Sequence, residues 1–208
     1  MLMKFKGMRK LEGSSHISRY DIEYETDDGR YKKYEIVSRD PNISGLEDLQ
    51  SWRSKTVVII GISPENDKIL LNKEFRMAVG DWIYNFPSGM IDEGELPTQA
   101  ATRELKEETG LTLEKRLVRL KSSYNAPGIT NETSSCVLAI VSGEISKSDS
   151  PYEEIIAGWY TREQVKTLLK TSKMSARTQL FCFAWVYGGL TIDKLAKETN
   201  DYGDGHLW

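Results

Sequence analysis

The chain has 208 residues, of which 39% are hydrophobic and 28% are charged. This composition is typical of a globular protein, and the length allows one full-sized domain with a smaller subdomain. The formal net charge of -3 lacks the basic excess that binding to nucleic acid or to an anionic membrane requires. We therefore expect neither partner.

Membrane spans, disulfide frameworks and thiolate metal sites are not expected either. The longest stretch without a charged residue, 178–192, is too short to cross a bilayer, and the N-terminus lacks the apolar stretch of a signal peptide. Two cysteines, Cys136 and Cys182, cannot form a four-thiolate zinc site. The two histidines, His16 and His206, lie near opposite ends of the chain. The sequence therefore predicts a cytoplasmic protein in which any bound metal has oxygen ligands.

The N-terminal part predicts a β-hairpin followed by a polar linker. Residues 20–24 and 31–37 alternate in polarity on either side of the turn Asp27-Asp28-Gly29, a pattern typical of two antiparallel strands. Residues 40–49 are polar and contain a proline and a glycine, as linkers do. The resulting boundary near residue 45 gives two parts: a small β subdomain at 1–45 and a main domain at 46–208.

Strands and helices are interleaved in the main domain. Apolar, β-branched residues at 56–62 are typical of a central strand. A helix is expected over 97–110, because Pro97 suits a first turn and Gly110 suits a C-terminal end. The other expected elements are strands at 68–71, 135–141 and 155–160 and helices at 162–169 and 176–186. This order indicates an α/β sandwich.

The helix expected at 97–110 carries an acidic face. Glu104, Glu107 and Glu108 occupy positions i, i+3 and i+4, so their carboxylates share one side of the helix and repel one another. A hard divalent cation that takes oxygen ligands from several of them would offset this repulsion. A solvated charged face is the alternative for these three residues alone. The upstream Gly89 favours the cation site, because a glycine lets the backbone approach a ligand closely.

The spacing around this helix resembles the signature of the Nudix family. Gly89 is followed after five residues by Glu95, and after seven more by the run that begins Arg103-Glu104 and ends Gly110-Leu111. The resemblance implies a hydrolase with the Nudix α/β/α sandwich, in which a mixed sheet lies between helices, and a bound Mg2+ or Mn2+. The metal ligands that it implies are the backbone carbonyl of Ser88, Glu104, Glu108 and, directly or through water, Glu107.

Other catalytic roles follow from the same resemblance. It places Arg103 and Glu107 in the catalytic machinery, with Arg103 holding a neighbouring carboxylate by a forked hydrogen bond, and Glu95 supporting the loop or the metal ligands. The general base in part of the family is a glutamate before a late strand, in a Glu-x-Ile context that Glu153 fits. Glu154 is the alternative, since strand alternation turns only one of the two inward. Both are surface carboxylates in a third interpretation.

The rest of the chain resembles the ADP-ribose pyrophosphatase branch of the family. Residues 126–132 resemble a motif of that branch, which implies substrate contacts from Pro127, Gly128 and Glu132, although an ordinary Pro-Gly turn is the alternative. Arg76 corresponds to an arginine that would pair with the substrate's diphosphate, or it is a surface arginine. The N-terminal hairpin resembles a subdomain that builds a homodimer. The implied reaction is Mg2+-dependent hydrolysis of ADP-ribose, or of a related nucleoside diphosphate sugar, to AMP and a sugar phosphate.

One departure from the branch pattern leaves the substrate open. The branch usually has Glu-x-Pro-Ala-Gly before the signature, whereas this chain has Asn85-Phe86-Pro87-Ser88-Gly89, so Asn85 removes a carboxylate near the site. GDP-mannose or another sugar nucleotide is therefore an alternative substrate. A non-hydrolytic nucleotide-sensing domain would lack acidic residues of the signature, and an NADH pyrophosphatase usually carries a four-cysteine zinc element. Every acidic position of the signature is present and only two cysteines occur, so a sensing domain and an NADH pyrophosphatase are alternatives that rank behind hydrolysis of a nucleoside diphosphate sugar.

Overall fold

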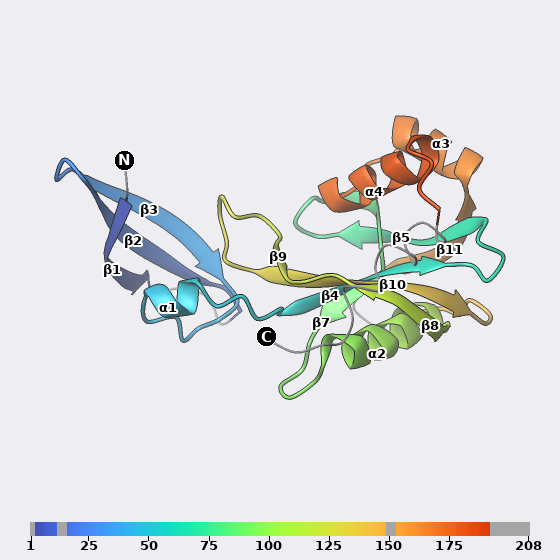
Figure 1. Cartoon of the computed structure of the whole chain (residues 1–208), viewed down its shortest axis with the longest axis horizontal. Coiled ribbons are helices and arrows are strands. Elements are labelled where there is room, and N and C mark those ends of the chain that lie inside the picture. Colours follow the sequence, from blue (N-terminus) through green and yellow to red (C-terminus); the bar gives the residue numbers. More distant parts are fainter. Residues whose placement is uncertain (1–2, 12–15, 149–152, 192–208) are drawn as a thin grey trace. The chain divides into compact units, whose positions relative to one another are not determined.

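The computed structural model describes residues 3–11, 16–148 and 153–191 (Figure 1). His206 lies outside these ranges. The described residues form two compact units: those up to Lys55 with Ser122–Ser134, and Thr56–Lys121 with those that follow from Ser135. The segment 122–134 therefore belongs with the N-terminal part, an association that the sequence patterns did not predict.

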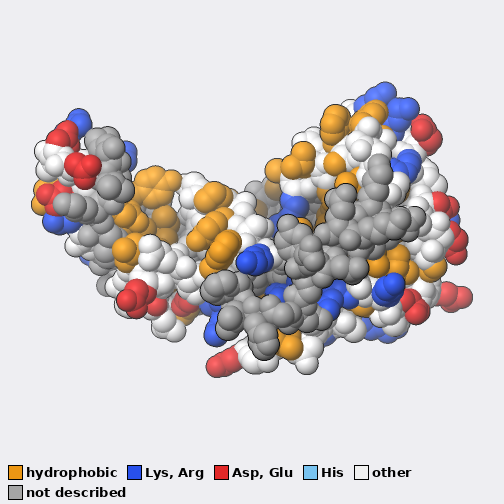
Figure 2. All heavy atoms as spheres, in the orientation of Figure 1, with side chains coloured by type: hydrophobic (Ala, Val, Ile, Leu, Met, Phe, Trp, Pro, Cys, Tyr) orange, Lys and Arg blue, Asp and Glu red, His pale blue; other side chains and the backbone are white. Residues whose placement is uncertain are grey.

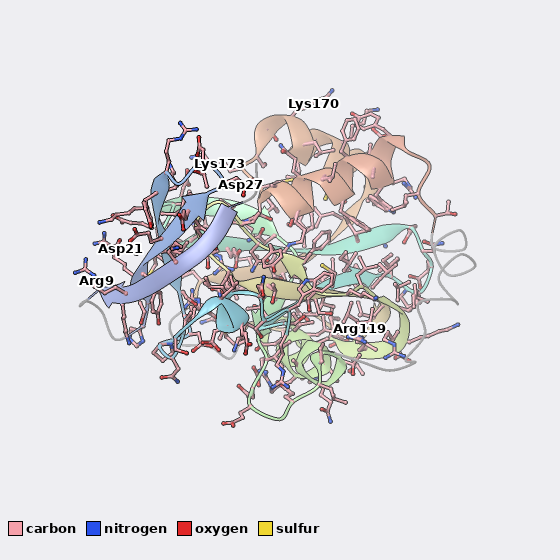
Figure 3. All side chains as sticks on the ribbon, turned by 60° about the vertical axis from the view of Figure 1, so that its left-hand side comes forward. Arg9, Asp21, Asp27, Arg119, Lys170 and Lys173 are labelled. Carbon is pink, nitrogen blue, oxygen red and sulfur yellow. The ribbon has the colours of Figure 1, made fainter. Side chains whose placement is uncertain are left out.

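The first unit is built on a three-stranded antiparallel sheet. Its strands are β1 (Met3–Leu11), β2 (Ser18–Thr26) and β3 (Tyr31–Ser38), and a short helix α1 (Leu46–Leu49) follows. The expected hairpin is formed by β2 and β3, and β1 adds a third strand beside β2. Charged side chains pair across the strands, as Arg9 and Asp21 do at 3.1 Å (Figure 3). The core of this unit consists of Tyr20, Ile22, Ile36 and Ile43.

The second unit is an α/β sandwich around an extended sheet. The strand order is β11-β5-β4-β10-β8, while β6 pairs with β5 and β7 pairs with β4; the short β9 pairs with the start of β10. The strands of this sheet are β4 (Thr56–Ile62), β5 (Lys68–Arg76), β6 (Asp81–Asn85), β7 (Ser88–Met90), β8 (Thr112–Arg119), β10 (Thr133–Ser142) and β11 (Ile155–Thr161). Strand β9 (Ser123–Tyr124) and the first two residues of β10 belong to the first unit. The helices are α2 (Pro97–Thr109), α3 (Arg162–Thr171) and α4 (Ala176–Tyr187). The fold class expected from the sequence is confirmed.

Strand β4 contributes to two apolar cores because its side chains alternate. Val57 and Ile59 pack in one core with Leu105 of α2. Val58 and its neighbours of the same parity pack in the other core with Trp185 of α4. Successive residues of a strand point to opposite faces, so α2 covers one face of the sheet and α3 and α4 cover the other (Figure 1).

Most expected elements lie within two residues of their predicted bounds, with one informative exception. Strand β5 continues to Arg76, five residues beyond the predicted end. The prediction stopped too early because Asn72, Lys73 and Glu74 interrupt the apolar run on which it was based. Strands β6, β7 and β8 were not predicted, since they are short or rich in polar residues. No helix in the described ranges is long and apolar enough to cross a membrane. Acidic and basic side chains are mixed over the face shown in Figure 2.

Candidate active site

Helix α2 presents the acidic side chains from a firmly packed base. Pro97 occupies its first turn, and Gly110 ends it in the left-handed conformation at a φ of 75°. Ala100, Ala101 and Leu105 are fully buried against the sheet. This packing fixes the rotation of the helix, so that Glu108 is buried and Glu104 is half-buried, whereas Glu107 is exposed.

Glu108 is a buried carboxylate with neutral partners. Its Oε2 accepts hydrogen bonds from Asn72 Nδ2 at 2.8 Å and from the backbone N–H of Ser88 at 3.2 Å. Burial raises the pKa of Glu108 well above its usual value, and the charges of Glu74, Glu104 and Glu153 raise it further. No basic side chain in the described ranges pairs with it, so Glu108 is a strong candidate for a cation ligand.

Gly89 makes room for the carboxylate of Glu104. Residues 88–90 form β7, which pairs with β4 and runs beside α2. A Cβ atom at Gly89 would lie 1.9 Å from the carboxyl carbon of Glu104 and about as close to both carboxylate oxygens. The glycine of the signature therefore admits an acidic side chain between the loop and the helix, where the sequence alone suggested only a close backbone approach.

Arg103 orients the carboxylates around it. Its Nε and Nη2 donate to the two oxygens of Glu95 at 3.1 and 2.8 Å, which is the forked geometry that arginine makes with a carboxylate. Its Nη1 donates to Glu104 at 2.7 Å and to Glu107 at 3.3 Å, and Nη2 also reaches the carbonyl of Met90. Hydrogen bonding to Arg103 lowers the pKa of Glu95. Arg103 thus links the upstream loop to the acidic helix through the kind of forked hydrogen bond expected for it, and its catalytic role stays a prediction.

The two candidate bases differ in their relation to this cluster. Both Glu153 and Glu154 are exposed and precede β11. The charge of Glu153 raises the pKa of Glu108 and also contributes to the raised pKa of Glu104, for which burial is the largest cause. The backbone carbonyl of Glu154 accepts a hydrogen bond from the N–H of Phe75 at 3.1 Å. This electrostatic interaction favours Glu153 over Glu154 as the candidate base, and its catalytic role stays a prediction.

A second row of polar residues on β5 adjoins the signature residues. Asn72 holds Glu108, and Glu74 accepts hydrogen bonds from Arg76 Nε at 2.8 Å and from Asn85 Nδ2. Arg76, a candidate for binding the diphosphate, is thus paired with a carboxylate of the chain itself. Sequence reasoning missed Asn72 and Glu74 as site residues. The signal that marks them is the break in the apolar run of β5 noted above.

The remaining candidates belong to the first unit. Residues 126–130 form a tight turn in which the N–H of Ile129 donates to the carbonyl of Ala126 at 2.9 Å. This turn, which contains Pro127, docks on β3, where Tyr34 donates to the carbonyl of Gly128 and Val37 donates to the carbonyl of Ile129. Glu132 forms an ion pair with Arg39 at 3.2 Å. The structure gives all three candidates local structural partners, and their substrate contacts stay predictions.

The donor set on α2 and β5 fits a hard cation. Within the described ranges, no three His, Cys, Asp or Glu side chains are already grouped at coordinating distances. However, burial and the nearby charges of Glu74 and Glu104 raise the pKa of Glu108, and Asn72 Oδ1 is buried beside Glu108 without a hydrogen-bond partner among the described residues. Carboxylate and amide oxygens are the ligands that Mg2+ and Mn2+ prefer.

Similarity to known proteins agrees with this site. Residues 52–180 match the family model described as "NUDIX domain". The chain is 37% identical over 76 residues to the ADP-ribose pyrophosphatase of Bacillus subtilis (strain 168), an alignment that covers 36% of this chain and only 40% of that protein. It is 28% identical over 143 residues to the ADP-ribose pyrophosphatase of Escherichia coli O6:H1, covering 64% and 68% of the two chains.

A solved structure shares the fold. The crystal structure of an ADP compounds hydrolase superposes with a TM-score of 0.64 at 22% identity, and the match covers 91% of this chain and 96% of the other. The matched family model spans more than half of the chain and contains the whole acidic helix with its upstream loop. The chain is therefore a member of the Nudix hydrolase family.

Proposed function

We propose that this protein hydrolyses the diphosphate linkage of ADP-ribose, or of a closely related nucleoside diphosphate sugar, to AMP and a sugar phosphate. The observation that carries the proposal is the buried carboxylate of Glu108, whose hydrogen-bond donors among the described residues are neutral and which lies among other acidic side chains. The choice of ADP-ribose is supported by the two pyrophosphatases to which the chain is similar. GDP-mannose is the second candidate, because Asn85 replaces the usual glutamate of the branch.

Glu104, Glu108 and the carbonyl of Ser88 would hold Mg2+ or Mn2+, with Glu107 contributing directly or through water from its exposed position. Bound divalent cations would lower the pKa of a water molecule and neutralise charge on the phosphates. The protein's own part is to keep these oxygens in place: Arg103 holds Glu104, and Asn72 holds Glu108. Glu153 takes a proton from the water as its oxygen attacks one phosphorus, and the bridging oxygen leaves with the other phosphate.

Hydrolysis of a panel of nucleoside diphosphate compounds tests the proposal. With Mg2+ or Mn2+ present, we expect ADP-ribose to be converted to AMP, with a higher kcat/KM than GDP-mannose, as measured by product chromatography. A clear preference for GDP-mannose would replace the proposed substrate. No turnover of any compound on the panel with either metal would contradict hydrolysis itself.

The identity of the base gives a prediction with a built-in control. Of the two candidates, Glu153 is the one whose charge is among the causes of the raised pKa of Glu104 and Glu108, so Glu153→Gln should lower kcat by about 10²- to 10⁴-fold, the usual contribution of a general base. Glu154→Gln, one residue away and equally exposed, should keep kcat within about threefold, which lies below that range. Steady-state kinetics on both variants decides between them, and the reverse pattern would move the role to Glu154.

We also propose that the protein is a homodimer in the cytoplasm. Strand β1 is an edge of the three-stranded sheet, and Tyr31 on β3 is an exposed aromatic residue of the kind enriched at interfaces. Two buried free thiols, Cys136 and Cys182, suit a reducing compartment. Light scattering on the purified protein should give twice the chain mass of 23.7 kDa. A monomer at all concentrations would contradict the dimer.

A further inference from the structure

Residue Asn85 interrupts the pattern of the signature loop, and the structure places a carboxylate beside it. Asn85 ends β6, and its Nδ2 donates to Glu74 Oε1 on the neighbouring strand β5. Glu74 is only 7% exposed, although it is a charged residue near the end of a strand. A carboxylate is rarely buried to this degree unless a specific partner or function holds it there.

Strand alternation explains why Glu74 belongs to the acidic cluster. Leu70 packs in the core that includes α2, and residues 72 and 74 follow it at intervals of two, so they share the face that α2 covers. Asn72 confirms this orientation, because its Nδ2 contacts Glu108 on α2 at 2.8 Å. Glu74 is the next residue along the same row, and its charge acts on Glu108.

The partners of Glu74 keep its carboxylate fixed in place. Arg76 Nε donates to Oε1 at 2.8 Å from a half-exposed position, while the side chain of Glu74 is 9% exposed. The amide of Asn85 is in turn contacted by Thr178 Oγ1, which donates to its Oδ1 at 3.4 Å. These contacts fix the amide with its nitrogen toward Glu74. A glutamate in place of Asn85 would put two like charges in direct contact.

We propose that Glu74 supplies, from β5, the negative charge that Asn85 removes from β6, and that it acts as a positioning residue which strengthens cation binding by Glu108. The inference rests on the proposed function of the acidic cluster as a metal site. Glu74, which is not a signature residue, thereby supports the metal ligands, and the amide of Asn85 donates a hydrogen bond to its carboxylate. The negative charge that the branch usually carries on β6, at position 85, is thus carried here by Glu74 on β5.

Direct titration with Mn2+ in the absence of substrate, followed by electron paramagnetic resonance, tests this inference. Glu74→Gln keeps the shape of the side chain and should weaken Mn2+ binding about 10- to 100-fold, as loss of a residue that supports metal ligands typically does. Asn85→Glu alone should lower the melting temperature, because it creates a like-charge pair. The double variant Glu74→Gln/Asn85→Glu reverses the pair and should recover most of the lost Mn2+ affinity.

The control is Glu163→Gln, which removes an exposed carboxylate on α3 that forms an ion pair with Lys166. It should leave Mn2+ affinity unchanged. Wild-type affinity in Glu74→Gln, or a double variant that binds as weakly as the single one, would overturn the inference. If Glu74→Gln does not fold, the Mn2+ affinity of the double variant is compared with that of the wild type. Affinity close to the wild-type value supports the inference, and a loss of about 10- to 100-fold would overturn it. A wild-type protein that binds Mn2+ but hydrolyses no nucleotide would contradict the proposed function and leave this inference intact.

Discussion

Glu108→Gln is expected to remove most of the hydrolytic activity and to make the metal-free protein more stable. Glutamine keeps an oxygen that can accept the hydrogen bonds from Asn72 and Ser88, so the local structure is retained. The variant loses the charge that would bind the cation. Since metal ions supply several kcal/mol of charge stabilisation, and each 1.36 kcal/mol is tenfold in rate, kcat should fall by about a thousandfold or more.

The gain in stability follows from the raised pKa of Glu108. A carboxyl group whose pKa is higher in the folded than in the unfolded chain binds its proton more tightly when folded, so stability falls as pH rises from the usual value of 4.5 toward the raised one. At neutral pH the carboxyl group is ionised in the unfolded chain, so its burial on folding costs free energy that glutamine does not cost. A gain of about 1 kcal/mol would raise the melting temperature by roughly 2–4 °C for a protein of this size.

Thermal melts in chelator at pH 7.5 and pH 5 measure this effect. The difference between variant and wild type should shrink at the lower pH, where the wild-type carboxyl group is closer to protonation. Glu107→Gln is the matched control, because Glu107 lies one residue away on α2 but is exposed. It should change the melting temperature by less than about 1 °C, as exposed substitutions usually do. A Glu108→Gln protein that melts below wild type at neutral pH would contradict the account of an unpaired buried charge.

Gly89→Ala is expected to abolish activity with little loss of stability. The added Cβ would occupy the space of the Glu104 carboxylate, at 1.9 Å from its carboxyl carbon. The backbone at Gly89 does not have a positive φ, so alanine introduces no backbone strain. The end of a flexible side chain can rotate away, but rotation separates Glu104 from Arg103 and from the cluster. We expect kcat to fall about 10²-fold or more, as displacement of a reacting group by about 1 Å can cause.

Gly61→Ala provides a contrasting variant on β4. Its Cβ would lie 2.9 Å from Val141 and 3.2 Å from Leu70, both in the closed apolar core, where overpacking costs about 1–3 kcal/mol. This variant should therefore lose stability and keep its kcat at temperatures where it remains folded. Thermal melts and kinetics on the two variants separate the effects. If Gly89→Ala retained full activity, Glu104 would not need its observed position.

The signature residues could be predicted because their relations are local. The 3.6-residue period of a helix places Glu104, Glu107 and Glu108 on one side of α2, and the bond between Arg103 and Glu95 spans eight residues. The sequence could not show that Glu108 is buried and Glu107 exposed, because that difference depends on how α2 packs on β4. The α/β sandwich could also be predicted from local patterns, because β4 is a continuous apolar run and α2 has apolar residues along one side.

The contributions of β5 could not be predicted from local patterns. Asn72 lies 36 residues before Glu108 in the chain, so no short motif contains both. A polar residue in a strand also looks like an ordinary strand end, so the apolar pattern alone ended this strand at Leu71, before Glu74. Only the pairing of β5 with β6 and with β11 shows that the strand continues past these residues and brings them to the cluster.

The docking of residues 122–134 on β3 affects how this protein can be recombined with its relatives. The N-terminal sheet and this loop form one compact unit that is discontinuous in the chain, joined by bonds such as that from Val37 to Ile129 at 2.9 Å. A chimaera that exchanged only the residues before Lys55 would combine a loop from one parent with a sheet from the other. Both segments have to be inherited together, which requires three crossover points instead of one.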